Sequence, residues 1–442
     1  MGSTVISIPD GEGVTLKEKK RFQFSLQPII SYLREHKKIQ FSLPPIVSYL
    51  REKTTKHDMR KLMHSVKVGI ALVLVSLIYL LDPLYGQVGD NAMWAIMTVV
   101  VMFEFFAGAT LSKGLNRAIG TVLGGGLGCL AAGLAEQVGG IGDIIIVGIS
   151  VFIFAALATY TRLMPKIKKR YDYGVMIFLL TFNLVVVSGI RVEKVLQLAR
   201  ERLLTIGMGF AICIFISLLI FPIWASDELH DSMASKFEDL AHSIEGCLEG
   251  YFKFVSEKET NEKESKPTAD FSSCKSVLNS KLKDESLANF AKWEPWHGKF
   301  GLYYPWGQYL QIGEHLRELA ATIISMQGCL QSPRQPSTTV RHSFKEPCEA
   351  VGSLLAWTLR ELRESMLKMR VCHAGDSIVP KLKSMRLELS LVISPSKLAT
   401  IENGDGFAIA TFMFLLMEIV EKVEELAKEV DELAEPAGFS TR

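Results

Sequence analysis

The sequence has few of the motifs that mark enzymes and metal sites. Its 442 residues contain no His-Glu-x-x-His, no Gly-x-Ser-x-Gly, no dinucleotide fingerprint and no Walker motif. The run Gly124-Gly125-Gly126 is not a phosphate loop, because no Gly-Lys-Ser/Thr follows it. The 7 cysteines are scattered without Cys-x-x-Cys spacing, which argues against a zinc site and a disulfide framework. We therefore expect no catalytic residue, no metal ion, no cofactor and no enzymatic activity.

An excess of one charge is also missing. The 49 Lys and Arg residues against 47 Asp and Glu leave a formal net charge of +2, which gives no reason to expect a nucleic-acid partner. The first 60 residues are polar and basic, without a short apolar core followed by a cleavage site. We therefore expect no removed signal peptide and an uncleaved first membrane helix.

What the sequence does contain is a series of long apolar runs between Leu62 and Trp224. A helix needs roughly 20 apolar residues to span a bilayer. In a bilayer only helices or closed barrels satisfy the backbone, and these runs are too long and unalternating for barrel strands. The predicted spans are residues 64–81, 92–107, 115–135, 142–161, 172–189 and 203–223. The fold class is thus predicted to be an all-α membrane protein, with six transmembrane helices followed by a cytosolic helical bundle domain.

The predicted loops alternate in positive charge. Residues 82–90 and 136–143, after the first and third helices, contain no Lys or Arg. The loops after the second and fourth helices contain Lys113, Arg117, Arg162, Lys166, Lys168, Lys169 and Arg170. Because positive loops stay in the cytosol, both termini are predicted to be cytosolic. We expect a basic arm (1–60), a six-helix channel domain (61–225) and a C-terminal helical domain (226–442).

The fifth loop breaks this alternation. Residues 191–202 are as basic as an inner loop, although parity places them outside. One interpretation is an amphipathic surface helix whose acidic residues offset the charge. The other is that Arg191 or Arg202 reaches a water-filled pathway, where Arg and Lys select anions. Lys67, just inside the first helix, leaves a similar choice between this pathway and snorkelling to the cytosolic interface.

Two further features lie inside the predicted spans. Gly120, Gly124 and Gly128 are spaced for close helix packing. Glu104 lies in a helix interior and needs a partner, for which Lys113 is a candidate.

The regions on either side of the apolar runs are polar. The arm repeats residues 24–35 as 41–52, either as basic segments that contact membrane lipid or as a duplication without function. After the last span, helical patterns cover residues 229–252, 308–330, 344–370, 379–392 and 407–433. Residues 407–420 are too short to span and are predicted to form a buried core helix. Leu416, Val420, Val423, Ala427 and Val430 resemble a coiled-coil seam, which indicates a contribution to dimerisation.

Several short segments of the sequence are distinctive: residues 94–101 (Trp-Ala-Ile-Met-Thr-Val-Val-Val), 108–117, 171–182, Phe221-Pro222-Ile223-Trp224 and Trp293-Glu294-Pro295. These segments resemble those of the aluminium-activated malate transporter family of plants. The resemblance covers about residue 55 to the end in one order. It implies a dimeric anion channel that passes malate and often chloride, nitrate or sulfate.

The resemblance also implies functional positions. The basic pore positions of the family fall on Lys67, Arg117, Lys166, Lys169, Arg170, Arg191 and Arg202, to which we add Lys113 in the second loop. The segment around Phe221 resembles the place where the family is proposed to sense the inhibitor GABA. Trp293, Glu294 and Pro295 are expected to be structural, as is the neighbouring His297.

The sequence departs from the family pattern in places. Ser226-Asp227-Glu228 stands where Gly-Glu-Asp is common, and Tyr304 stands where a His is usual. The duplicated arm is unfamiliar, and the C-terminal half lacks a long acidic tail. Regulation is therefore expected to differ from that of better-known members.

We therefore expect an anion channel for malate and inorganic anions, in the plasma membrane rather than the vacuolar membrane. The rival is a proton-coupled organic-acid or aromatic-acid exporter, which needs a titratable relay within the spans. Glu104 is the only obvious carboxylate for such a relay. A third alternative is a membrane-anchored scaffold built around the helical half.

Overall fold

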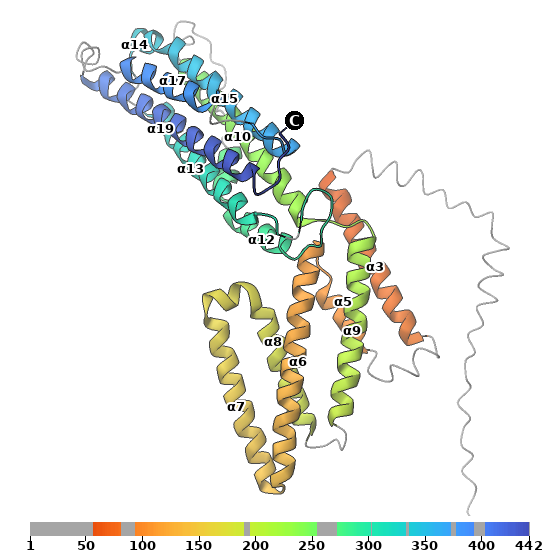
Figure 1. Cartoon of the computed structure of the whole chain (residues 1–442). Coiled ribbons are helices and arrows are strands. Elements are labelled where there is room, and N and C mark those ends of the chain that lie inside the picture. Colours follow the sequence, from red (N-terminus) through yellow and green to blue (C-terminus); the bar gives the residue numbers. More distant parts are fainter. Residues whose placement is uncertain are drawn as a thin grey trace, which may run out of the picture.

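The computed structural model describes residues 56–80, 93–189, 195–253, 272–301, 303–332, 336–372, 377–392 and 403–441. Within these ranges the chain is helical apart from turns and isolated bridges, which confirms the all-α prediction. The duplicated arm lies outside the described residues. The described helices form two bodies that meet end to end, an apolar helical group (56–219) and a C-terminal bundle (225–441) (Figure 1).

The apolar helical group runs up and down several times. Its helices are α3 (Lys56–Leu80), α5 (Met93–Met102), α6 (Ala107–Val138), α7 (Ile141–Leu163), α8 (Pro165–Gly189) and α9 (Val195–Leu219). The α7–α8 turn lies at the end next to the bundle, and the α6–α7 turn lies at the far end (Figure 1). Helix α6 packs mainly on α8, and α5 on α9.

Glycines set the close approach of α6 to α8. A Cβ atom on Gly120 would collide with the carbonyl oxygen of Gly174, and one on Gly124 would lie 2.6 Å from that of Phe178. A Cβ on Gly128 would lie 2.9 Å from the Val185 side chain. The predicted packing role of this glycine stripe is confirmed, because only a residue without a side chain fits these positions.

Apolar side chains cover much of the outer surface of this group. On α7, Ile141, Ile144 and Phe152 are 79%, 66% and 74% exposed. Among the described residues, three helices are long and apolar enough to cross a membrane: Ala107–Val138, Ile141–Leu163 and Arg170–Val187. Met93–Met102 and Leu203–Leu219 are apolar but shorter. Large exposed apolar surfaces of this kind are typical of helices that contact lipid or a partner.

The loop predicted after the second span is wrong. Lys113 and Arg117 lie within α6, which is continuous from Ala107 to Val138. The break falls earlier, after Met102, where the Thr110 hydroxyl accepts a hydrogen bond from the Glu104 backbone N–H at 3.1 Å. The prediction failed because it placed every cation in a loop. Lys113 and Arg117 instead have polar partners inside the apolar helical group, Glu104 and Tyr173. Four residues apart, Lys113 and Arg117 share one face of α6.

The fourth predicted loop is also shorter than expected. Only Met164 separates α7 from α8, because Pro165 starts a helix favourably at its first position. Arg162 therefore lies in the last turn of α7 and Arg170 lies within α8. Arg162 pairs with Asp172 across this turn at 2.8 Å.

The C-terminal bundle closely matches the predicted helical patterns. Its helices are α10 (Ala225–Lys253), α11 (Ser272–Leu278), α12 (Lys281–Ala291), α13 (Trp306–Gln331), α14 (Thr338–Ser343), α15 (Lys345–Lys368), α17 (Val379–Val392) and α19 (Asn403–Ala434). Helix α10 packs mainly on α15, and α13 on α19. The expected apolar stripe of α10, from Leu229 to Phe252, is buried in the common core.

Helix α19 uses its apolar residues within the same chain. The predicted seam, Leu416, Val420, Val423, Ala427 and Val430, is buried in this core. The start of α19, predicted to be a buried core helix, is only partly buried. Phe412 stacks on Tyr251 with ring centres 3.9 Å apart, but Phe407 and Phe414 are 78% and 60% exposed. The seam therefore holds one chain together and is not free to join two.

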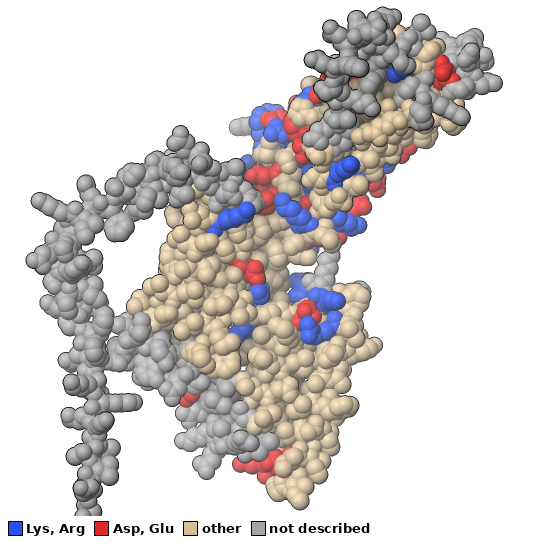
Figure 2. Space-filling view, turned by 180° about the vertical axis from the view of Figure 1, so that it is seen from behind, with Lys and Arg blue, Asp and Glu red and all other residues tan. Residues whose placement is uncertain are grey.

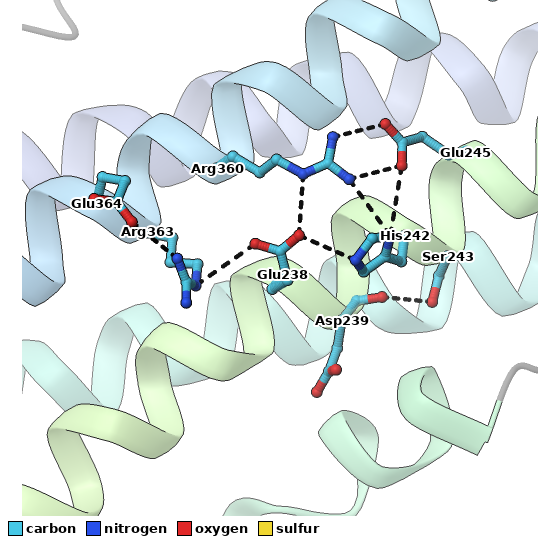
Figure 3. Close-up of polar contacts among 8 residues, drawn as sticks. All are labelled: Glu238, Asp239, His242, Ser243, Glu245, Arg360, Arg363 and Glu364. Carbon is cyan, nitrogen blue, oxygen red and sulfur yellow. Dashed lines mark hydrogen bonds and ion pairs between the residues drawn. The ribbon is translucent and has the colours of Figure 1, made fainter.

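A polar network ties α10 to α15 at the bundle surface (Figure 3). The Arg360 guanidinium donates to Glu245 at 2.7 Å and to Glu238 at 3.0 Å. His242 lies 3.1 Å from Glu238, and Arg363 lies 3.6 Å from it. The hydrogen bonds from Arg360 lower the pKa of the Glu245 carboxyl. Because these side chains are part-exposed, the network orients the two helices more than it stabilises them.

Candidate anion pathway

Basic residues gather where the apolar helical group meets the C-terminal bundle. Figure 2 shows Lys and Arg side chains around this junction, whereas the rest of the apolar helical group is almost free of them on the face in view. Lys67 lies on α3, one turn before Ala71 in the core shared by α3, α5 and α9, and is only 2% exposed. None of the described carboxylates forms an ion pair with it. A buried cation without a carboxylate is unusual, because removing an unpaired charge from water is costly.

Lys113 is held by the carboxylate predicted as its candidate partner. Its Nζ donates to Glu104 Oε1 at 2.5 Å. The same ammonium lies 5.4 Å from the centre of the Tyr173 ring, within the range of a cation–π contact. Glu104 thereby has the expected partner, but the prediction that it lies in a helix interior is wrong: it lies in the break between α5 and α6, and its side chain is 40% exposed.

Arg117 is the most enclosed of the predicted site residues of α6. It is 6% exposed, and its Nη1 donates to the Tyr173 hydroxyl at 3.1 Å. Its buried Nε has no hydrogen-bond partner among the described residues, and neither has the buried hydroxyl of Thr121, one turn further along α6. Buried polar atoms are nearly always satisfied, so two orphans together indicate a place for a ligand or water.

Arg117 and Thr121 line a cavity of about 440 Å³ inside the apolar helical group, called the inner cavity below. Its walls include Trp94 of α5, Arg117, Thr121 and Cys129 of α6, Ile177 and Val185 of α8, and Arg200 of α9. Since a helix rises about 1.5 Å per residue, the cavity follows α6 for about 18 Å between Arg117 and Cys129. It is apolar along most of this length, with an arginine toward each end.

A second cavity of about 420 Å³ lies at the junction with the bundle. Lys113, Asn116, Arg170 and Tyr173 come from α6 and α8, and Glu285, Asn289, Lys292 and Trp293 come from α12 and the turn after it. Along α6 and α8 this junction cavity ends at Asn116 and Tyr173, and the inner cavity begins at Arg117 and Ile177. The hydrogen bond from Arg117 to Tyr173 therefore joins a residue of the inner cavity to a residue of the junction cavity.

Arg170 lies between aromatic rings in the junction cavity. Its guanidinium carbon is 5.4 Å from the centre of the Tyr171 ring and 5.5 Å from that of Trp293. Its backbone carbonyl accepts a hydrogen bond from the Asn116 side chain at 3.1 Å. These contacts hold the Arg170 guanidinium in place. It forms no ion pair with a carboxylate among the described residues.

Not every predicted site residue can be placed. Arg191 lies outside the described residues, as do the side chains of Lys166, Lys169 and Arg202. Arg200 lies in the basic stretch 191–202 but was not predicted to be a pathway residue, although it lines the inner cavity. Lys292 was not predicted either, since nothing in the sequence links α12 to the membrane helices.

The expected structural motif joins the two bodies. Glu294 Oε1 accepts the backbone N–H of Ala225 at 2.6 Å, and Oε2 accepts the N–H and the hydroxyl of Ser226 at 3.2 and 2.6 Å. A carboxylate at this position satisfies the free N–H groups at the start of α10 and complements its dipole. Gly108 of α6 packs directly against Glu294 and the carbonyl of Phe290, so there is no room for a side chain.

His297 and Phe221 lie beside this joint. The ring of His297 stacks on Trp224 at 3.9 Å, and its nitrogens lie 2.7 Å from the Pro295 carbonyl and 2.9 Å from the Ser226 hydroxyl. Phe221 follows the end of α9 with φ at +45° and is 65% exposed. A bulky residue with positive φ is strained, which marks the bend from α9 into α10 as a constrained connection.

Comparison with known proteins agrees with this arrangement. A family model described as aluminium activated malate transporter matches residues 52–405. Aluminum-activated malate transporter 2 of Arabidopsis thaliana is 41% identical over 387 residues, which cover 88% of this chain and 77% of the relative. Aluminum-activated malate transporter 13 of the same plant is 45% identical over 335 residues, covering 75% and 62%. Aluminum-activated malate transporter 1 of Triticum aestivum is 37% identical over 400 residues, covering 87% and 84%.

These matches extend through both bodies of the structure. A family of transporters agrees with the expectation that the chain is not an enzyme. Together with its apolar helices, the match places the chain in a membrane. The chain belongs to the aluminium-activated malate transporter family.

Proposed function

We propose that this protein conducts malate, and with it small inorganic anions such as chloride, nitrate and sulfate, through a pathway lined by Lys and Arg. The observation that carries the proposal is the succession of the two cavities along α6 and α8, with Arg117 and its unsatisfied Nε between them. The names of its relatives support malate as the substrate.

The chemistry of the cavities suits anions. Arginine donors in a low-dielectric conduit replace part of the hydration shell that an anion loses on leaving water. Arg117 and Arg200 supply such donors toward the two ends of the inner cavity, while the wall between them is largely apolar. Cations around the junction raise the local concentration of anions before they enter. Lys67, buried on α3, lines neither cavity, and its charge adds to the positive potential of the apolar helical group.

The proposed topology has six spans with both chain ends in the cytosol. The N-terminal end of α3 and the start of α10 lie at one end of the group, joined by an ion pair between Arg60 and Glu228 at 2.6 Å. That end also carries the basic α7–α8 turn, as the positive-inside rule requires. The junction cavity then opens toward the cytosol. Tags at either terminus should be accessible only after permeabilisation, and staining of intact cells would contradict this topology.

We further propose a homodimer in the plasma membrane. Exposed Phe407 and Phe414 on α19 and exposed Leu387 on α17 support a contact with a second copy. Single-molecule bleaching of a fluorescent fusion should give two steps at the cell surface. One-step bleaching would reject the dimer, and signal confined to the vacuolar membrane would reject the location.

A regulatory role at Phe221 also belongs to the proposal. Its strained, exposed position at the bend between α9 and α10 supports a point where a small molecule alters the joint between the two bodies. Phe221→Ala should change inhibition by GABA without changing the permeant ion. An unchanged inhibition curve would remove this role.

The proton-coupled exporter is less well supported than the channel. Such a carrier needs a carboxylate free to take up and release protons within the spans, and the candidate Glu104 is bound to Lys113.

Voltage-clamp recording tests the proposed function directly. With malate as the main permeant anion, the reversal potential should follow the malate gradient, and replacement by chloride should leave a measurable current. A protein delivered to the surface without anion current would reject the channel. Saturable flux driven by pH, without channel-like unitary currents, would favour the exporter.

A further inference from the structure

The junction cavity is not built by the membrane helices alone. One wall comes from α6 and α8, and the opposite wall comes from α12 and the turn that begins the Trp293-Glu294-Pro295 segment. Glu294 fixes this turn to α10, and Gly108 fixes it against α6. The position of α12 relative to the pathway is therefore set by packed contacts.

The charges in this cavity are divided between the two walls. Lys113 is bound to Glu104, so its charge is largely compensated. Arg170 on α8 and Lys292 at the C-terminal end of α12 form no ion pair with a carboxylate among the described residues, although Glu285 of α12 also lines the cavity. The two cations thus come from different walls of one cavity.

Neutral hydrogen-bonding groups complete the lining. Ser112 and Asn116 lie on the α6 side, and Ser286 and Asn289 lie on the α12 side. Hydroxyl and amide groups of this kind can bind the hydroxyl of a small hydroxy acid, while the cations bind carboxylates. The Arg170 guanidinium is already oriented by Trp293, which reduces the entropy lost on binding.

We propose that Lys292 of the C-terminal bundle, together with Arg170, makes the junction cavity a binding site that selects dicarboxylates over monovalent anions. This inference rests on the proposed function. A dicarboxylate carries two negative groups that can each interact with a cation, whereas chloride carries a single charge. The bundle is thereby a direct part of the selectivity of the pathway.

A purely structural role for Lys292 makes a different prediction. A lysine at the end of a helix also interacts favourably with the helix dipole. If that were its whole role, its replacement would lower stability without changing which anion passes. Ion selectivity therefore separates the two roles.

The test compares Lys292→Glu with Lys275→Glu, an exposed lysine on α11 that lines neither cavity. Reversal potentials are measured with malate on the bundle side and chloride on the other. Lys292→Glu should lower the malate-to-chloride permeability ratio about fivefold or more, since it replaces an attraction for one carboxylate by a repulsion. Lys275→Glu should keep the parental ratio, and Lys292→Arg should keep most of it.

The outcomes separate this inference from the proposed function. No malate current in the parent protein would reject the proposed function. A parental current with the same ratio in Lys292→Glu and Lys275→Glu would overturn the inference alone. If Lys292→Glu fails to reach the surface, Lys292→Cys replaces it: a cationic thiol reagent should restore malate preference and an anionic one should not. Equal ratios after both reagents have reacted would also overturn the inference.

Discussion

The apolar helical group and the C-terminal bundle both bury charged residues, but in opposite ways. In the bundle, Asp284 is fully buried and its Oδ2 accepts from Lys236 at 2.5 Å and from Arg317 at 3.1 Å. In the apolar helical group, Lys67 and Arg117 are almost as buried as Asp284. Neither of them forms an ion pair with a carboxylate among the described residues. Compensated charge in the bundle connects α10, α12 and α13. Uncompensated charge in the apolar helical group supports the proposed anion pathway.

Physical costs explain the difference. Removing one member of a buried ion pair leaves a charge that neither water nor protein stabilises. A cation in a membrane helix has the same cost unless it faces a water-filled cavity or binds an anion. Asp284 and Arg317 in the bundle also have one unsatisfied buried atom each, so what distinguishes Arg117 is the cavity that it lines and its lack of a carboxylate partner among the described residues.

The largest expected loss of stability comes from breaking the compensated charge. Asp284→Asn leaves the buried Lys236 without a carboxylate, while Arg317 keeps Glu314 as a partner, and should lower the free energy of unfolding by about 3–5 kcal/mol. Thermal unfolding of the detergent-solubilised protein measures this effect. Asp172→Asn, which removes a part-exposed pair with Arg162, is the control and should change the midpoint little. Equal shifts in both variants would mean that burial does not distinguish the two pairs.

A smaller effect should follow from filling the α6–α8 contact. Gly124→Ala places a Cβ atom 2.6 Å from the Phe178 carbonyl oxygen, so the helices must move apart. Overpacking of this kind costs about 1–3 kcal/mol. The matched control is Gly133→Ala on the same helix, where a Cβ meets nothing within 4 Å. Indistinguishable melting curves for the two variants would show that this close approach does not limit stability.

The smallest effect concerns the dependence of bundle stability on pH. His230 is 6% exposed, its Nδ1 lies 2.9 Å from the Tyr309 hydroxyl, and burial lowers the pKa of its ring. Since the unfolded ring has the higher pKa, the unfolded state binds more protons on acidification. The stability contributed by the neutral ring is therefore present above about pH 6.5 and is lost as pH falls through the lowered folded pKa.

His230→Gln removes this titration and should reduce the loss of stability between pH 7.5 and pH 5.5. Melting midpoints of parent and variant across this range measure the difference. A variant that loses as much as the parent would assign the acid sensitivity to other groups.

The sequence predicted the bundle better than the pathway. Apolar spacing over 229–252 and 407–433 located α10 and α19 well, because burial in one core imposes helical periodicity. The Glu104–Lys113 pair was also predicted, since a carboxylate within an apolar stretch of sequence needs a partner. Both predictions depend on local chemistry that the sequence contains.

The pathway depends on contacts between distant segments. Lys113 and Arg117 were assigned to a loop, because counting cations between apolar runs cannot show that a helix continues through them. Arg200 and Lys292 were not selected, since their positions follow from packing of α9 beside α6 and of α12 against α6. Sequence patterns predict which residues are buried, but not which distant side chains share a cavity.

The central claim is that an uncompensated cation at Arg117 acts on anions, whereas a paired one does not. The most direct measurement is malate current per channel at the cell surface for Arg117→Ala and for Arg162→Ala, whose arginine is paired with Asp172. Arg117→Ala should reduce the malate current per channel at least about tenfold. A charge-assisted contact contributes roughly 1.5–3 kcal/mol, and about 1.4 kcal/mol is a factor of ten. Arg162→Ala should retain most of the current. Equal currents in the two variants at equal surface density would contradict the account.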